Sequence, residues 1–171
     1  MFLFLIPLAL FALTPPQSTN SSTCEAARAQ AESSYRQRNS LKTRQRAEIN
    51  LNHALELCVS NPVHLRLDRR LRIVQEEIAF THLQIALFYP RADGVGLLKG
   101  ALSHLRLVDE NYPNFSQFDR VLFLLGDYSD RNGDARDAAI YFRRLIANYP
   151  RSSYVAEARK RLAGLSANGE T

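Results

Sequence analysis

The chain has 171 residues, 46% apolar and 23% charged, a balance typical of one globular domain and not of a disordered protein. Seven Gly and seven Pro supply too few turns for an all-β fold, which favours long helices. The net charge of +5 arises over 24–72, where ten Lys and Arg face five Asp and Glu; this favours an anionic partner (nucleic acid, anionic lipid or acidic protein) or else reflects solvated helix faces.

The first residues form an uncharged apolar run followed by a polar, proline-containing stretch. Residues 1–13 read MFLFLIPLALFAL, too short to cross a bilayer about 30 Å thick and typical of the apolar core of a secretory signal. We expect 1–22 to be a signal peptide or an N-terminal apolar segment with a polar linker. An uncleaved anchor and a buried helix are the alternatives. Export would make nucleic acid the least favoured partner.

Two amphipathic helices are expected after this segment. Ser22 and Glu25 have the spacing of a capping box, and apolar residues at helical spacing follow, which predicts a first helix over 24–38. A second helix is predicted over 41–59, because Pro62 biases the residue before it away from helical geometry. The two helices should form an antiparallel hairpin.

Antiparallel packing of this hairpin would bring the chain's two cysteines together. Cys24 begins the first helix and Cys58 ends the second. A disulfide between them would close a loop of about 35 residues and stabilise the fold by about 4 kcal/mol on the chain-entropy model. A lipid-modified Cys24 and two unmodified buried thiols are the alternatives.

A long third helix and a shorter fourth helix are predicted over 63–89 and 95–111. Leucine, valine and isoleucine recur at heptad-like spacing in the first half of the third helix, and turn residues after Tyr89 end it. The third helix also carries a basic patch that would suit an acidic segment of a partner, a solvated face being the alternative. This patch consists of Arg66, Arg69 and Arg70.

Residues 116–150 predict a further pair of antiparallel helices with a close contact between them. Gly126 and Ala138 are small where the helices must approach, and larger apolar residues stand beside them. The letters NYP close this pair at 148–150 and also close the fourth helix at 111–113, thirty-seven residues upstream. The repeated ending indicates a repeated structural unit.

The spacing in this pair resembles the tetratricopeptide repeat, a unit of about 34 residues with a small residue followed by an aromatic one in its second helix. With Asp119 as position one, the marker positions hold Leu122, Leu125, Gly126, Ala138, Phe142 and Pro150. A weaker copy begins at His82, with Tyr89 and Pro90 departing from the pattern. The resemblance implies an all-α fold of antiparallel hairpins stacked as a short right-handed solenoid. The hairpins are expected at about 24–61, 63–112 and 116–150, with a capping helix at 152–165, in a domain spanning 23–166 that leaves 167–171 as a frayed tail.

A narrower resemblance covers 82–166. The stretch NYPRSSYVAEARKRLAGL after GDARDAAIYFRRLIANYP is similar to the C-terminal repeats of exported bacterial envelope proteins, namely the lipoprotein of the outer-membrane barrel-assembly machinery and the periplasmic repeat protein of the Tol-Pal system. It implies a non-enzymatic scaffold in the periplasm or on the periplasmic face of the outer membrane. Other envelope proteins would bind its concave groove, with membrane association through the N-terminus as an option. A self-associating structural subunit, burying its apolar third helix against another copy, is the alternative.

In the tetratricopeptide repeat the groove is lined by the second, fifth, ninth and twelfth positions of the first helix. The resemblance places Arg120, Phe123, Asp127 and Asp130 there. Phe123 would be an apolar anchor for a partner. Packing against the neighbouring helix is the alternative for this residue.

The sequence contains no recognisable catalytic, metal or cofactor motif. YSDRNGD lacks carboxylates at the first and twelfth positions of a calcium loop, and GVGLLKG has Lys99 where a dinucleotide loop needs glycine. The four histidines have no ligand spacing. We therefore expect no enzyme activity, no cofactor and no small-molecule substrate.

Overall fold

The computed structural model describes residues 18–59, 63–89 and 95–168, and within these ranges all regular structure is helical. The all-α prediction is thereby confirmed. The predicted apolar run at 1–13 lies outside the described residues. The helices are α1 (Ser18–Arg36), α2 (Leu41–Leu57), α3 (His64–Phe88), α4 (Val95–Asn111), α5 (Phe118–Arg131), α6 (Ala135–Asn148) and α7 (Val155–Asn168).

Most helix ends lie within two residues of the predicted ones, but the two ends of the chain differ. The predicted capping box at Ser22 and Glu25 is wrong, because α1 begins at Ser18 and Ser22 lies inside it. No Gly or Pro interrupts 18–36, so the helix continues through the polar residues. The capping box belongs to α2, where Ser40 Oγ accepts from the backbone N–H of Thr43 at 3.3 Å and the Thr43 hydroxyl accepts from the Ser40 N–H at 2.9 Å. The last helix continues to Asn168, beyond the predicted start of the frayed tail.

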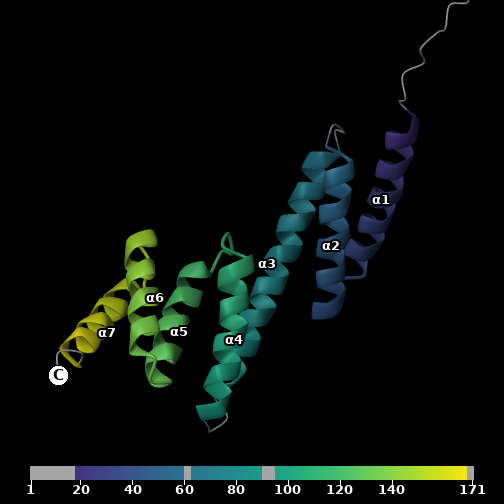
Figure 1. Cartoon of the computed structure of the whole chain (residues 1–171). Helices are drawn as coiled ribbons and strands as arrows, with labels where there is room; N and C mark the ends of the chain where they lie inside the picture. Colours follow the sequence, from purple (N-terminus) through teal and green to yellow (C-terminus); the bar gives the residue numbers. More distant parts are fainter. Residues whose placement is uncertain (1–17, 60–62, 90–94, 169–171) are drawn as a thin grey trace, which may run out of the picture.

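The helices follow one another in space in chain order, from α1 at one end of an elongated molecule to α7 at the other (Figure 1). The main contacts between elements join helices that are consecutive in the chain. Long-range packing is therefore a series of neighbour contacts, and α3, the longest helix, lies between the two ends of the series.

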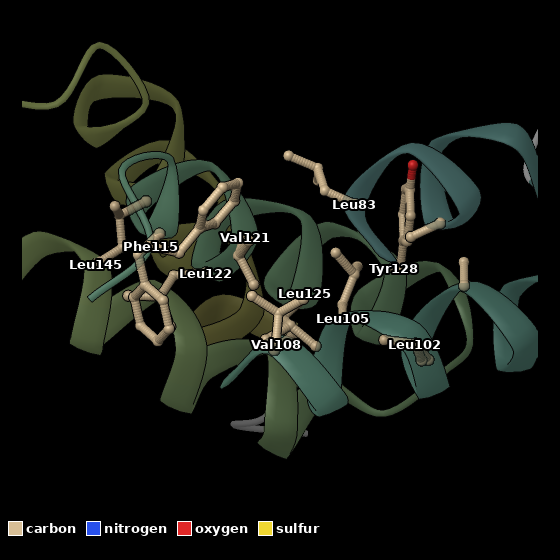
Figure 2. Close-up of a cluster of buried hydrophobic side chains, with 14 of the residues drawn as sticks. Leu83, Leu102, Leu105, Val108, Phe115, Val121, Leu122, Leu125, Tyr128 and Leu145 are labelled. Carbon is tan, nitrogen blue, oxygen red and sulfur yellow. The ribbon is translucent and has the colours of Figure 1, made fainter. Parts of the chain in front are cut away.

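Two apolar clusters form the core, and α3 contributes to both. One joins α1, α2 and the first half of α3 around Leu51, Leu67 and Ile78. The other joins the second half of α3 to α4–α7, and part of it is drawn in Figure 2. Because α3 enters both clusters, it ties the N-terminal hairpin to the rest of the molecule.

A disulfide joins Cys24 of α1 to the C-terminal end of α2 at Cys58, with the two Cα atoms 5.2 Å apart. Both cysteines are buried in the N-terminal cluster. This bond closes the open end of the hairpin, while the Ser40 capping box fixes its turn. The bonded pair corresponds to the first of the three states expected from sequence.

The predicted close approach of α5 and α6 is confirmed. A Cβ placed on Gly126 would lie 2.5 Å from Cε1 and 2.7 Å from Cδ1 of Phe142, closer than any real side chain tolerates. Ala138 is also fully buried at this contact. The missing side chain of Gly126 therefore makes the space that the Phe142 ring fills.

The last helix packs on the same cluster through the residues that the sequence places on one face. Ala158 is fully buried, and Tyr154, Leu162 and Leu165 pack partly buried against the cluster. Helix α7 therefore covers the apolar surface that α5 and α6 would otherwise expose.

Candidate interaction surface

The partly exposed Phe123 ring packs against two neighbouring aromatic rings. Its ring stacks on that of Tyr154, just before α7, with centroids 4.9 Å apart and planes at 21°, and it also meets Phe142 at 6.1 Å. These contacts correspond to the alternative given for Phe123, packing against the neighbouring helix. Phe123 packs against the following helix because the connection to α7 crosses the face on which it lies.

The predicted groove carboxylates are bound within the chain as well. Arg161 of α7 donates from Nη2 to Asp127 Oδ1 at 2.5 Å and from Nη1 to Asp130 Oδ2 at 3.3 Å. Arg120 donates to Gln117, the N-cap residue of α5. Asp127 and Asp130 thus lie where α5 meets α7, while Arg120 contacts the residue that precedes its own helix.

Of the three arginines in the predicted basic patch, one contacts another helix and two are exposed. Arg70 forms an ion pair with Glu32 of α1 and lies over the Tyr35 ring, 5.1 Å from its centroid. Arg66 and Arg69 remain exposed. Arg70 therefore holds α1 against α3.

A continuous exposed face runs along α3. Its members are separated by four, four, seven, four and four residues, a spacing that keeps them on one side of a helix. It extends over about 35 Å at 1.5 Å per residue. We call it the α3 face, and it consists of Leu65, Arg69, Ile73, Phe80, Gln84 and Phe88.

The apolar members of the α3 face are unusually open for their type. Ile73 is 39% exposed, Phe80 44%, Phe88 71% and Leu65 78%. Single exposed apolar residues are common on protein surfaces, but an aligned series of them marks an interaction site. The α3 face is the longest such series among the described residues.

The carboxylates that border the α3 face are already engaged. Glu32 pairs with Arg70, and Glu77 accepts from Arg38 Nε at 3.1 Å with Arg44 Nε at 3.4 Å. Glu76 accepts from the backbone N–H of Ser116 at 3.1 Å. Asp68 pairs with Arg72, whereas within the described ranges Arg66 and Arg69 form no ion pair.

A notch of about 770 Å³ lies where α4 ends beside the middle of α3, with Leu71, Tyr112 and Phe115 among its lining. The Tyr112 hydroxyl donates to Glu48 Oε2 at 3.1 Å, and burial, then the Glu48 charge, raises the pKa of this phenol. The carboxylate of Glu76, on its edge, holds the α4–α5 connection. Its polar groups are thus used to join helices.

One polar contact is buried between α3 and α4. The Nδ1 atoms of His82 and His104 are 2.8 Å apart, so one ring donates and the other accepts, and Tyr89 stacks on His104 at 5.9 Å. Burial lowers the pKa of both imidazoles, and for His82 the positive charge of His104 lowers it further. Both rings are therefore neutral near pH 7.

The described residues contain no group of three or more His, Cys, Asp or Glu side chains arranged to hold a metal.

Comparison with protein-family models, with curated proteins and with solved structures finds no match for this chain. None of the helices in the described ranges combines the length and apolarity needed to cross a membrane. The surface must therefore be interpreted from its own residues.

The sequence indicated the third helix as a contact surface through its basic patch and through self-association but did not identify the apolar residues of the α3 face, because the heptad-like positions mark only the core side of this helix. A signal was present: Ile73 and Phe80 are large apolar residues that fall outside the stripe Leu67, Val74 and Ile78. An apolar residue off the buried stripe of a long amphipathic helix indicates a second contact surface.

Proposed function

We propose that this protein is a non-enzymatic scaffold that binds a segment of a partner protein along the α3 face. The observation that carries the proposal is the alignment of four exposed apolar side chains on α3 beside Arg66 and Arg69, which form no ion pair within the described ranges. Apolar anchors surrounded by polar groups are typical of binding hot spots.

The proposed architecture is a short tetratricopeptide-like solenoid closed by α7 as a capping helix. Two features support it: the principal helix contacts join chain neighbours, and Phe142 packs into the space left by Gly126. In such a stack the first helix of each hairpin faces the groove. The proposal therefore keeps the groove but moves its binding residues from α5 to α3.

We place the scaffold in the bacterial cell envelope, where its partners are other envelope proteins. We propose that it takes part in outer-membrane protein assembly. The apolar run at 1–13 and the resemblance of the motifs in 82–166 to exported envelope repeats support export. A disulfide between Cys24 and Cys58 fits an oxidising compartment. Mass spectrometry of the mature protein tests this placement, since export with cleavage predicts a new N-terminus and an intact disulfide.

The α3 face can be tested by replacing Ile73 and Phe80 with Ser and comparing capture of envelope partners with that of an Ile140→Ser control. Ile140 lies on α6 and is 44% exposed, as Phe80 is, but it has no apolar series around it. Burying two half-exposed side chains contributes about 1–2 kcal/mol in total, so the double variant should bind roughly tenfold more weakly. Equal capture by the double variant and the control would refute the proposal.

A self-associating subunit is the second candidate, and the exposure of Leu65 and Phe88 at the two ends of α3 favours it. A second copy could cover the same face. Light scattering distinguishes the two functions: the scaffold predicts a monomer at micromolar concentration, whereas a self-associating subunit predicts a dimer that the Ile73→Ser/Phe80→Ser variant abolishes.

A further inference from the structure

A cleft of about 600 Å³ lies between α1 and α3, beside the N-terminal half of the α3 face. Three arginines line it, Arg28 and Arg36 from α1 and Arg66 from α3, and Glu32 is the one carboxylate in its lining. We call it the arginine cleft. Its charge is therefore strongly positive before any partner is present.

The carboxylate of Glu32 shows the electrostatic effect of the arginine cleft on a negative charge. Its carboxylate is paired with Arg70 and lies 3.7 Å from Arg36 Nη2. The hydrogen bond from Arg70 is the main cause of a lowered pKa at Glu32, and the charges of Arg70, Arg36 and Arg66 lower it further against the opposing effect of burial. The arginine cleft therefore stabilises a negative charge. The single carboxylate of Glu32 does not neutralise the positive charge of the three lining arginines.

Two of the lining arginines have no acidic partner. Within the described ranges, neither Arg28 nor Arg66 forms an ion pair or a side-chain hydrogen bond, although Arg66 lies near enough to Glu32 to act on it. Guanidinium groups bind carboxylates through paired, charge-assisted hydrogen bonds. Both side chains are thus available for an external carboxylate without breaking an internal contact.

The spacing of the arginines that line the cleft matches the spacing of side chains along an extended peptide. Glu32 pairs with Arg70, and Arg38 pairs with Glu77, so α1 and α3 run side by side in the same direction. Arg28 and Arg36 are eight residues apart on α1, with Glu32 between them, so they are separated by about 12 Å along the helix axis. In an extended chain, side chains on the same face repeat at about 6.6–6.8 Å. An extended segment with acidic residues four positions apart, about 13 Å, would therefore reach both Arg28 and Arg36.

We infer that the arginine cleft binds the carboxylates of an acidic partner segment, whose apolar residues continue onto the α3 face at Ile73. This inference rests on the proposed function and names the chemistry of the partner. Arg66 and Arg69 are on the same helix as the apolar anchors, so one segment can reach both sites. An acidic peptide is favoured over an anionic membrane because the positive groups lie in a cleft between two helices and not on a flat surface.

The test measures binding of a fluorescein-labelled oligoglutamate peptide by fluorescence anisotropy. The variant Arg28→Gln/Arg66→Gln removes the two unpaired arginines. The matched control, Arg136→Gln/Arg143→Gln, removes the same charge from exposed positions on α6. We expect the cleft variant to bind at least about tenfold more weakly and the control to bind as the unaltered protein does, with affinity falling as salt is raised.

Absence of binding by the unaltered protein, or an equal loss in both variants, would overturn the inference, because the effect would then come from net charge. Anionic phospholipid vesicles that bind with the same dependence on Arg28 and Arg66 would also overturn it in favour of a lipid surface. If the cleft variant is poorly folded, hydrogen exchange on the unaltered protein replaces it. Oligoglutamate must then protect α1 and the first half of α3, and protection elsewhere refutes the cleft.

Failure of this inference is distinguishable from failure of the proposed function. If Ile73→Ser/Phe80→Ser lowers partner capture while Arg28→Gln/Arg66→Gln changes neither capture nor oligoglutamate binding, the scaffold stands and the acidic partner is rejected.

Discussion

Replacement of Gly126 by Ala tests the contact on which the packing of α5 against α6 depends. The added Cβ would lie 2.5, 2.7 and 2.9 Å from three atoms of the Phe142 ring, which is fully buried and has no free space beside it. Overpacking of this kind costs about 2–3 kcal/mol. Because Ala is a better helix former than Gly by about 1 kcal/mol, the net loss in unfolding free energy should be about 1–2 kcal/mol.

The same substitution at Gly164 provides the control. Gly164 lies within α7, and a Cβ there would meet nothing within 4 Å. Only the gain in helix propensity then applies, so Gly164→Ala should raise the unfolding free energy by about 0.5–1 kcal/mol. Urea unfolding followed by far-ultraviolet circular dichroism measures both changes, which should have opposite signs.

A second substitution identifies the cause. Phe142→Leu removes the ring atoms that the new methyl group would contact, so Gly126→Ala should become neutral or stabilising in that background. If Gly126→Ala stabilises the protein as Gly164→Ala does, or if its cost is unchanged by Phe142→Leu, the proposed contact does not control the packing.

Three further predictions follow from the other contacts. Replacement of Cys24 and Cys58 by Ser should lower the unfolding free energy by about 4 kcal/mol, since the bond spans 34 residues; a change below about 1 kcal/mol would mean that the bond does not restrain the unfolded chain. Burial lowers the pKa values of His82 and His104, so the unfolded chain binds protons at higher pH than the folded one, and stability should fall as the pH drops below 6.5; a His82→Leu/His104→Leu variant should lose this dependence, and its persistence would assign it to other groups. Arg161→Gln should cost about 1 kcal/mol in thermal unfolding because it leaves Asp130 without its cation and Asp127 with only Arg131 of its own helix, and an unchanged midpoint would show that these ion pairs are fully screened.

The helices and their order could be predicted from sequence because the signals are local. Apolar spacing and Pro62 located α2 to within two residues, and the small residues Gly126 and Ala138 located the tightest helix contact. The start of α1 was missed because the polar residues after Ser18 are weak helix formers but contain nothing that breaks a helix.

The interaction surface could not be predicted in the same way, because exposure depends on which helix packs next. Phe123 occupies a groove position in a single repeat, but Tyr154 covers it once α7 is in place. Arg70 has the same sequence context as Arg66 and Arg69, yet only Arg70 meets Glu32 on another helix. Such contacts join residues 31 to 38 positions apart, and helical periodicity within one segment carries no information about them.

The most direct test of the central proposal is site-specific photocrosslinking in the cells that make the protein, with a photoreactive phenylalanine analogue at Phe80 and, separately, at the equally exposed Ile140. The α3 face predicts a discrete crosslinked adduct from Phe80 that is absent from Ile140. Adducts of the same size and yield at both positions would contradict the account. So would the absence of an adduct from Phe80 when the labelled protein is folded in the cells.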